Sequence, residues 1–570
     1  MYMHHRIPGV TKVTRISKYL LVGVAFVCFA LASPQLATAQ KAPVASASAP
    51  DFAPAMIEHM QKMRRYKDAD HGVQQTPRVI DRFRVDEDPK GAIASYQPGG
   101  ATITANNAFF KDLGTNGRTC FTCHQPQNGW GVSAHDVAER FENSAGTDPI
   151  FRLVDGATCP SDDVSTLRKK KEAYRLLIKH GLIRVGLAIP ATAEFTVTAV
   201  EDPYGCNTNP ATGIVKQTPT QTIGVLSMYR RPLPTANIVF DSAIMWDGRE
   251  SPPTIDLDTG FRNQAVDATL THAQAAAPPT PEQVDEIVKF QKGLFTAQIF
   301  DHKAKFLTGD NSKGGPILLS LQDFFVGIND PLGGNPKGTS FTSQIFSLYR
   351  PWLSAGERHD HEDPITPMMT PMGNIEELFK TVTFRDGWRF NEHEHDMVSE
   401  HRRSVARGEE LFNTTKINIT GVSGLNDKLG IDSIGGFCGT CHDAPNVGNH
   451  SVKLPIDIGV PDAGANKPPA LDIAELPVFT LTCSNVADGH PLKGKVYQVT
   501  DPGRAMISGK CEDIGRFKGP ILRGLAGRAP YFHNGAAANL RDVVEFYDQR
   551  FNIGFTHKQK NDLVNFLNTL

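Results

Sequence analysis

The sequence lacks an excess of charge of either sign, since its 570 residues hold 59 lysines and arginines against 61 aspartates and glutamates. A nucleic-acid-binding protein normally carries a basic excess, so that class is excluded. After residue 31 the sequence also lacks any apolar run long enough to span a bilayer. Its 50 glycines and 39 prolines argue against a coiled coil, and a hydrophobic content of 40% argues against a wholly disordered chain. What remains is a loop-rich, multidomain globular protein.

The N-terminal segment has the layout of a secretory signal peptide. An apolar run over 19–31 follows a stretch that carries basic residues and no acid, and the small residues Ala37-Thr38-Ala39 provide a cleavage site. The run is short for a membrane span, and an uncleaved anchor is the alternative. We predict a signal peptide over 1–39, an N-terminal extension over 40–105, export to the periplasm, and no membrane attachment after cleavage.

Two identical cysteine patterns carry the clearest chemistry. They are Cys120-Phe121-Thr122-Cys123-His124 and Cys438-Gly439-Thr440-Cys441-His442. The two-residue gap lets both thiols form thioethers with one edge of a porphyrin, and the next histidine can bind its iron. A zinc site would need a second cysteine pair or histidines at ligand spacing, which neither pattern has. We predict two covalently bound haem c groups, attached through Cys120, Cys123, Cys438 and Cys441, with His124 and His442 as iron ligands.

Four further cysteines lie outside the haem motifs, and each pair of them follows its own motif along the chain. The exported compartment is oxidising, so we predict the disulfides Cys159–Cys206 and Cys483–Cys511. Four cysteines allow three connectivities, and free buried thiols are the alternative.

Helix signals are spread along the chain. Part of 163–183 is predicted to be helical, whereas 195–200 reads as a strand. A capping box formed by Thr280 and Gln283 starts a helix whose apolar stripe is Val284, Ile287, Val288, Leu294 and Phe295. Val405, Gly408, Leu411 and Phe412 lie at helical spacing, and the glycine allows close contact with another helix. Two C-terminal helices begin at Asn539 and Thr556, the first with an apolar stripe of Leu540, Val543, Val544 and Tyr547.

These signals predict a mainly α fold with two cytochrome c-type haem domains and loop-rich insertions. The first haem domain is placed over 106–275 and the second over 401–570, with a connecting insertion over 276–400.

Several longer motifs make the sequence resemble the bacterial di-haem cytochrome c peroxidases and the related MauG-type enzymes. The resemblance covers roughly 100–275 and 400–570, and the region between is longer than the usual spacer of the family. The motifs are Met245-Trp246-Asp247-Gly248-Arg249, Asp501-Pro502-Gly503-Arg504, Phe517-Lys518-Gly519-Pro520-Ile521-Leu522-Arg523-Gly524, and Ala529-Pro530-Tyr531-Phe532-His533-Asn534-Gly535 running on to Val543-Val544-Glu545-Phe546-Tyr547.

The resemblance implies a division of labour between the two haems. The haem on His124 would react with peroxide at an open sixth position, and the haem on His442 would be six-coordinate and pass electrons. Trp246 would lie between them as an electron bridge, although a large aromatic in a core is the alternative interpretation.

The resemblance also indicates residues around each iron. Gln264 falls where the family has a distal glutamine, and Gln274 stands where the family usually has a glutamate that moves a proton. Glutamine is no base, so we expect His272 to take over proton transfer. The alternatives are weak peroxidase chemistry and a His272 that is only a buried core residue. Tyr547 aligns with the sixth ligand of the second iron, and Met506 is the alternative ligand.

The leading interpretation is a periplasmic oxidoreductase resembling cytochrome c peroxidase that uses hydrogen peroxide. Its electrons would come from a small redox protein, such as a cytochrome c or a cupredoxin, or from an organic substrate. A haem dioxygenase resembling bacterial rubber oxygenases and a plain di-haem electron carrier are the alternatives. The family also often holds calcium, for which no ligands are assigned here. His/Asp/Glu clusters at 359–363 and 393–396 are read as solvated loops rather than metal sites.

Overall fold

Helices account for 31% and strands for 17% of the residues that the structure describes. This structure is a computed structural model that describes residues 76–207, 224–354, 392–484 and 489–570, without the side chains of 392–395. The prediction of a mainly α protein is therefore wrong, and the fold mixes helices with several small sheets. The predicted signal peptide lies outside the described residues, and the domain boundaries at 275 and 400 stay predictions.

A four-stranded antiparallel sheet joins the segment before the first haem motif to a segment about 200 residues later. Its strands are β2 (Phe83–Asp88), β3 (Gly91–Tyr96), β8 (Phe295–Asp301) and β9 (Lys305–Phe306), in that spatial order. Tyr96 pairs with Phe295 at one end of the β3–β8 ladder. Such partners are distant along the chain, so no local periodicity of the sequence predicts the sheet.

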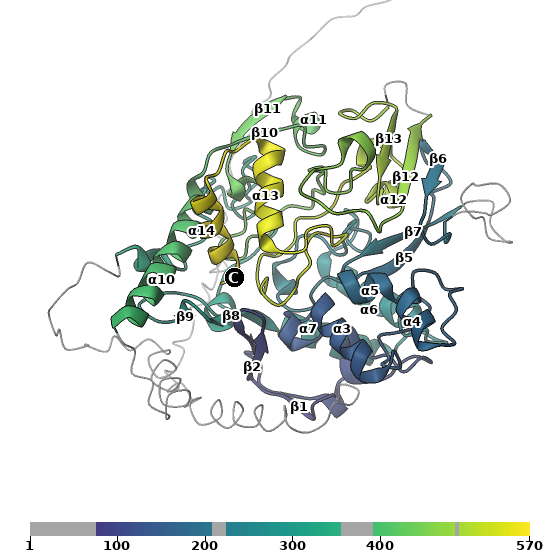
Figure 1. The fold of residues 1–570 in the computed structure, drawn as a ribbon, viewed down its shortest axis with the longest axis horizontal. Helices are drawn as coiled ribbons and strands as arrows, with labels where there is room; N and C mark the ends of the chain where they lie inside the picture. The colour runs from purple at the N-terminus through teal and green to yellow at the C-terminus, as the bar shows by residue number, and fades with distance from the viewer. Residues whose placement is uncertain (1–75, 208–223, 355–391, 485–488) are drawn as a thin grey trace, which may run out of the picture. The chain divides into compact units, whose positions relative to one another are not determined.

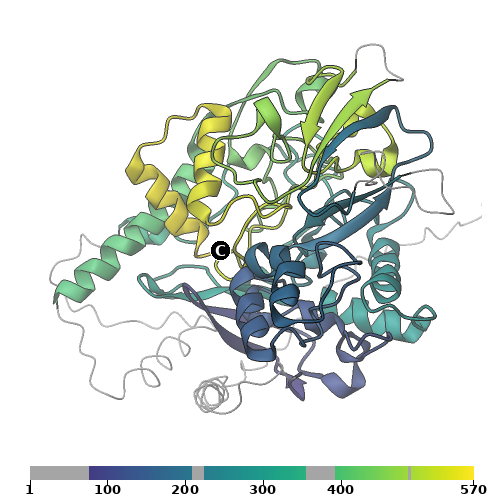
Figure 2. The same ribbon diagram turned by 45° about the vertical axis from the view of Figure 1, so that its right-hand side comes forward.

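A three-stranded sheet likewise joins distant segments. Its central strand is β12 (Val478–Cys483), with β13 (Val496–Val499) on one side and β6 (Phe195–Glu201), the strand predicted at 195–200, on the other (Figures 1 and 2). Both predicted disulfides are confirmed, because Cys159 is bonded to Cys206 and Cys483, at the end of β12, is bonded to Cys511. The remaining pairs are β1 (Val79–Ile80) with β4 (Thr102–Ile103), β5 (Ile183–Ala188) with β7 (Val225–Arg230), and β10 (Ile417–Thr420) with β11 (Ser433–Gly436).

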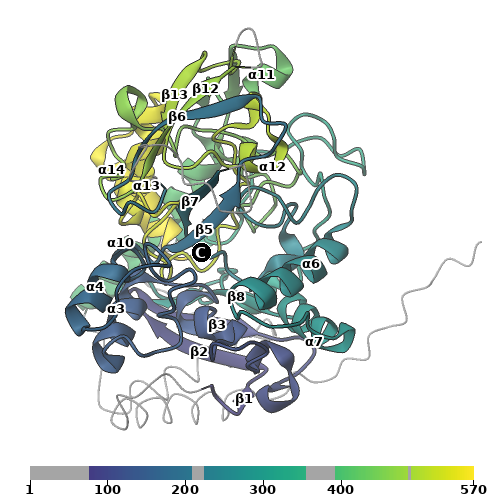
Figure 3. The same cartoon turned by 90° about the vertical axis from the view of Figure 1, so that its right-hand side faces the viewer.

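Most described α-helices in the first half of the chain begin at a side-chain cap, and α5 (Arg175–His180) is an exception. The predicted helix at 163–183 is present as α4 (Leu167–Ala173) and α5, and α3 (Ala134–Ser144) precedes them. The predicted capping box starts α7 (Pro281–Lys292), which packs beside α6 (Leu257–Thr271) (Figure 3). The stripe expected to continue to Leu294 and Phe295 is wrong at its end, because the helix stops at Gly293 and Phe295 opens β8.

Three helices surround the second haem motif in space. The long helix α10 (Glu392–Thr414) packs against α14 (His557–Leu567), and α13 (Leu540–Phe551) contacts α14 (Figure 2). Asn539 and Thr556 cap α13 and α14 as predicted. In the described ranges, no helix is both long and apolar enough to cross a bilayer.

Short elements complete the fold. The short α-helices are α2 (Cys120–Cys123), α8 (Pro316–Leu319), α11 (Asn426–Leu429) and α12 (Ala505–Ser508), and the 3-10 helices are η1 (Thr104–Asn106), η2 (Ala108–Phe110), η3 (Pro126–Asn128), η4 (Ile238–Phe240), η5 (Arg350–Leu353), η6 (Cys438–Thr440), η7 (Gly464–Asn466) and η8 (Cys511–Asp513).

Gly408 allows α10 and α14 to approach closely, as the sequence predicts. A Cβ atom at Gly408 would lie 2.1 Å from the Asp562 carbonyl oxygen and 2.6 Å from Cβ of Phe566. We therefore expect Gly408→Ala to lower the free energy of unfolding by about 1–3 kcal/mol, the usual cost of overpacking. Urea denaturation checks this value. Gly435→Ala is the control, because its Cβ would meet nothing within 4 Å; equal urea midpoints for both variants would contradict the prediction.

Candidate functional site

The first haem motif opens into a cavity between α2 and α6. Thr119 caps α2 through a capping box with Thr122, and this short helix places Cys120 and Cys123 on the cavity wall, followed by His124. Both cysteines are free thiols. Burial raises the pKa of Cys120 to about 12, which argues against a redox dithiol, whose thiol pKa is lowered.

The histidine of each motif is held by a backbone carbonyl. His124 Nδ1 lies 2.9 Å from the Trp130 carbonyl oxygen, and His442 Nδ1 lies 2.7 Å from the Gly448 carbonyl oxygen. Burial lowers the pKa of His124 to about 4 and also lowers the pKa of His442, so both imidazoles are neutral at pH 7. A neutral ring that donates its Nδ1 proton to a carbonyl keeps the lone pair on Nε2, as an iron ligand requires.

The second motif lines another cavity, which is almost entirely apolar. Cys438, Cys441 and His442 face the α13 side chains Leu540, Val543, Val544 and Tyr547 across it. Burial raises the pKa of the Tyr547 phenol, so the group is protonated unless a cation binds it. Met506, the alternative ligand, does not line this cavity and packs instead against the β6–β12–β13 sheet.

Trp246 and Lys518 line both cavities and so form their shared wall. The Trp246 indole Nε1 donates to the Arg231 carbonyl at 2.7 Å, and the Trp246 carbonyl accepts from the Lys518 amide at 2.9 Å. The Lys518 ammonium pairs with Asp241 Oδ1 at 2.6 Å. Hydrogen bonds therefore hold Trp246 both at its backbone and at its indole ring.

Helix α6 presents one face to the first cavity. Phe261, Gln264, Ala268 and His272 are spaced by three or four residues, and all of them line it. Gln274 does not, because the chain turns at the end of α6 and leaves its side chain exposed, in a hydrogen bond with Asn116. The structure thus brings Gln264 and His272 together with the first haem motif and leaves Gln274 outside.

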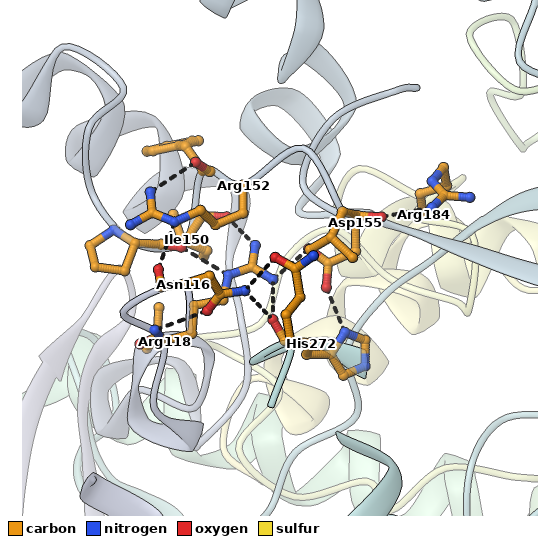
Figure 4. Close-up of polar contacts among 12 residues, drawn as sticks. Asn116, Arg118, Ile150, Arg152, Asp155, Arg184 and His272 are labelled. Atoms are coloured by element: carbon orange, nitrogen blue, oxygen red, sulfur yellow. Dashed lines mark hydrogen bonds and ion pairs between the residues drawn. The ribbon is translucent and has the colours of Figure 1, made fainter. Parts of the chain in front are cut away.

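Two residues that the sequence analysis did not identify hold His272 (Figure 4). Asp155 Oδ2 lies 2.5 Å from His272 Nδ1, and Asp155 Oδ1 lies 2.5 Å from Arg118 Nη1. Burial alone would raise the pKa of Asp155, but Arg118 and His272 together hold it below its usual value. The position of Arg118, two residues before the first haem motif, is only a weak sequence signal of a functional role. Nothing in the sequence around Asp155 indicates such a role.

His533 also lies at the second cavity. Its ring stacks on Phe517 at a centroid distance of 3.7 Å and meets the edge of Trp246 at 6.2 Å. Burial lowers the pKa of His533 to about 3, so the ring is neutral.

The residues of both cavities fit a covalently bound haem. Each cavity holds a pair of free thiols and a neutral histidine whose Nδ1 is already bonded to the backbone. Cys159, Cys206, Cys483 and Cys511 are consumed by the disulfides, so the thiols of the two motifs stay available. Among the described residues, no group of three or more His, Cys, Asp or Glu side chains is arranged to hold a metal ion, so no calcium ligands are identified there. The cluster at 359–363 and the side chains of 393–395 lie outside the described residues.

Sequence comparison finds similar proteins for part of the chain, although no family model matches it. The chain is 28% identical over 155 residues to cytochrome-c peroxidase IdrP1 of Denitromonas iodatirespirans, which covers 23% of this chain and 36% of that protein. It is 30% identical over 142 residues to cytochrome-c peroxidase IdrP2 of the same organism, with coverage of 24% and 36%. Against cytochrome-c peroxidase IdrP2 of Pseudomonas sp. (strain SCT) the identity is 32% over 112 residues, with coverage of 20% and 28%.

The chain thus spans only about a third of the length of the curated relatives it matches. Among solved structures, a MauG-like protein associated with microbial copper homeostasis aligns with 81% of this chain and 87% of its own, at 13% identity and a TM-score of 0.29. A TM-score this low establishes no shared fold. The chain is therefore similar, over about a quarter of its length, to proteins named cytochrome-c peroxidase.

Proposed function

We propose that the protein is a di-haem c oxidoreductase that reacts with peroxide in the first cavity and exchanges electrons through the second. The observation that carries this proposal is the contrast between two cavities that share one wall. The first presents Gln264 and His272 beside its haem motif, whereas the second is mostly apolar and presents Tyr547 and the stacked, neutral ring of His533. The similarity to cytochrome-c peroxidases supports the same assignment.

In this proposal Cys120 and Cys123 hold the first haem and His124 is its protein ligand, while the second haem is held by the equivalent residues Cys438, Cys441 and His442. A bound haem supplies the redox chemistry that none of the twenty side chains can provide. Gln264 orients peroxide through its amide, and His272 moves a proton, because a neutral imidazole is a base near neutral pH.

The shared wall is proposed to couple the two cavities. Trp246 is the aromatic group common to both, and its hydrogen bonds to Arg231 and Lys518 keep it in one orientation. We propose that the protein is exported to the periplasm and that electrons enter from a small redox protein or an organic substrate.

Spectroscopic titration of the purified holoprotein with hydrogen peroxide tests the function. We expect a high-spin haem population that changes its spectrum at stoichiometric peroxide, together with a low-spin haem. Two low-spin haems that ignore peroxide would instead establish an electron carrier. Oxygen consumption with an organic substrate, without a peroxide response, would establish an oxygenase.

Tyr547 is proposed as the sixth ligand of the second iron. Tyr547→Phe removes the phenol oxygen and keeps the ring, so we expect the absorption and electron paramagnetic resonance spectra of the low-spin haem to change while those of the other haem stay constant. Met506→Leu is the matched control, because Met506 lies outside the cavity. Unchanged low-spin spectra for Tyr547→Phe, or a change for Met506→Leu, would remove Tyr547 from this role.

A further inference from the structure

His272 is placed at the edge of the first cavity by the end of α6. It follows the last helical residue, Thr271, and its backbone N–H still bonds to the Ala268 carbonyl. Its side chain is 39% exposed, whereas the partner of its ring, Asp155, is only 6% exposed. The ring therefore has one side in the cavity and the other against a buried carboxylate.

Arg118 holds both the carboxylate and the backbone around His272. Its Nη1 lies 2.5 Å from Asp155 Oδ1 and donates to the His272 carbonyl at 3.2 Å. Its other nitrogens donate to the Pro149 carbonyl at 2.8 Å and to the Ile150 carbonyl at 2.6 Å. The guanidinium of Arg118 is thus held by four acceptors, and it in turn holds the Asp155 carboxylate against the His272 ring (Figure 4).

This contact decides which ring nitrogen carries the proton in neutral His272. An ionised carboxylate only accepts hydrogen bonds, so Nδ1 must donate to Asp155, and the lone pair then lies on Nε2. Asn116 Nδ2 donates to the His272 carbonyl at 2.8 Å and does not compete for the ring. The Nε2 lone pair is thus the base that His272 offers on its side away from Asp155.

We infer that Asp155 is a positioning residue for His272, which fixes the tautomer and the orientation in which Nε2 accepts a proton in the first cavity. This inference rests on the proposed function. The proton that Nε2 takes from one peroxide oxygen is returned to the other, so the net proton change is zero, and Asp155 stays ionised throughout. The carboxamide of an asparagine can instead donate to Nδ1 and favour the opposite tautomer.

The test compares Asp155→Asn and Asp155→Glu in the holoprotein, alone and combined with His272→Gln. We expect Asp155→Asn to slow the reaction with peroxide about 10- to 100-fold, and Asp155→Glu to recover part of that loss. Because His272 is the group through which Asp155 acts, Asp155→Asn should slow the reaction no further when His272→Gln is already present. The association rate of cyanide is a second readout that does not depend on turnover. Hydrogen cyanide must lose its proton to bind ferric haem, so this rate should fall together with the rate of the peroxide reaction.

Asp148→Asn is the matched control, because Asp148 is also a buried carboxylate and pairs with Arg140 at 2.6 Å without contacting His272. It should lower stability and leave both rates within about twofold of the wild-type rates.

Equal rates for wild type and Asp155→Asn, or additive losses in the double variant, would overturn the inference. If the Asp155→Asn protein does not retain haem, Asp155→Glu is used instead. Its rate is then compared with and without His272→Gln, and this comparison decides the inference. A wild type that ignores peroxide would instead refute the proposed function.

Discussion

The double substitution Cys120→Ser with Cys123→Ser is expected to leave the protein with one covalently bound haem and to abolish its response to peroxide. Serine has nearly the same size as cysteine but forms no thioether, so the first cavity loses its covalent hold on the porphyrin. No other described cysteine can replace the two thiols, because Cys159, Cys206, Cys483 and Cys511 are bonded in disulfides and Cys438 and Cys441 line the second cavity. Mass spectrometry of the denatured protein counts the covalent haems, and a peroxide titration checks the loss of response.

The equivalent change in the second motif, Cys438→Ser with Cys441→Ser, serves as the control. It is expected to remove the other haem and to spare the high-spin species that reacts with peroxide, because the two cavities have separate thiol pairs. Two haems in the mass of either variant, or an unmodified wild-type chain from a host that matures cytochromes c, would contradict covalent attachment at these cysteines.

His272→Gln is expected to slow the reaction with peroxide about 10²- to 10⁴-fold, the range over which a positioned acid or base contributes to catalysis. Glutamine can keep a hydrogen bond to Asp155, but it cannot accept and return a proton. The second haem is proposed to lie in the other cavity, so its spectrum should stay the same. Stopped-flow absorption measures the rate.

His135→Gln provides the control for this change. His135 lies on α3 with 70% of its side chain exposed, and we expect its replacement to leave the rate unchanged. A His272→Gln protein that reacts within about threefold of the wild-type rate would show that proton transfer uses water or another group.

The secondary structure that could be predicted from the sequence depends on nearby residues. The cap at Thr280, the helix starts at Asn539 and Thr556 and the strand at 195–200 are all confirmed. The prediction of a mainly α fold was wrong because the sheets depend on residues that are far apart in the sequence. β3 pairs with β8 and β6 pairs with β12 across long separations in the chain, and such pairings leave no local period to detect.

In the candidate site, too, features set by nearby residues could be predicted and features set by tertiary packing could not. The spacing within α6 places Gln264 and His272 on one face, but the turn that leaves Gln274 exposed is not visible in that spacing. The sequence left Tyr547 and Met506 as alternative ligands, and of the two only Tyr547, on α13, lines the second cavity. The contact of Asp155 with His272 spans 117 residues, so it depends on tertiary packing alone.

The sequence by itself predicted the covalent haem attachment that is proposed for this protein. Two thiols and a histidine within five residues need only local backbone geometry to meet one porphyrin, and helix caps act over three residues. The tertiary structure decided which side chains line the cavities beside the two motifs and that Trp246 and Lys518 form a wall common to both. The reason is that burial and contact between distant segments arise from packing of the whole chain, whereas hydrogen bonds within one turn do not.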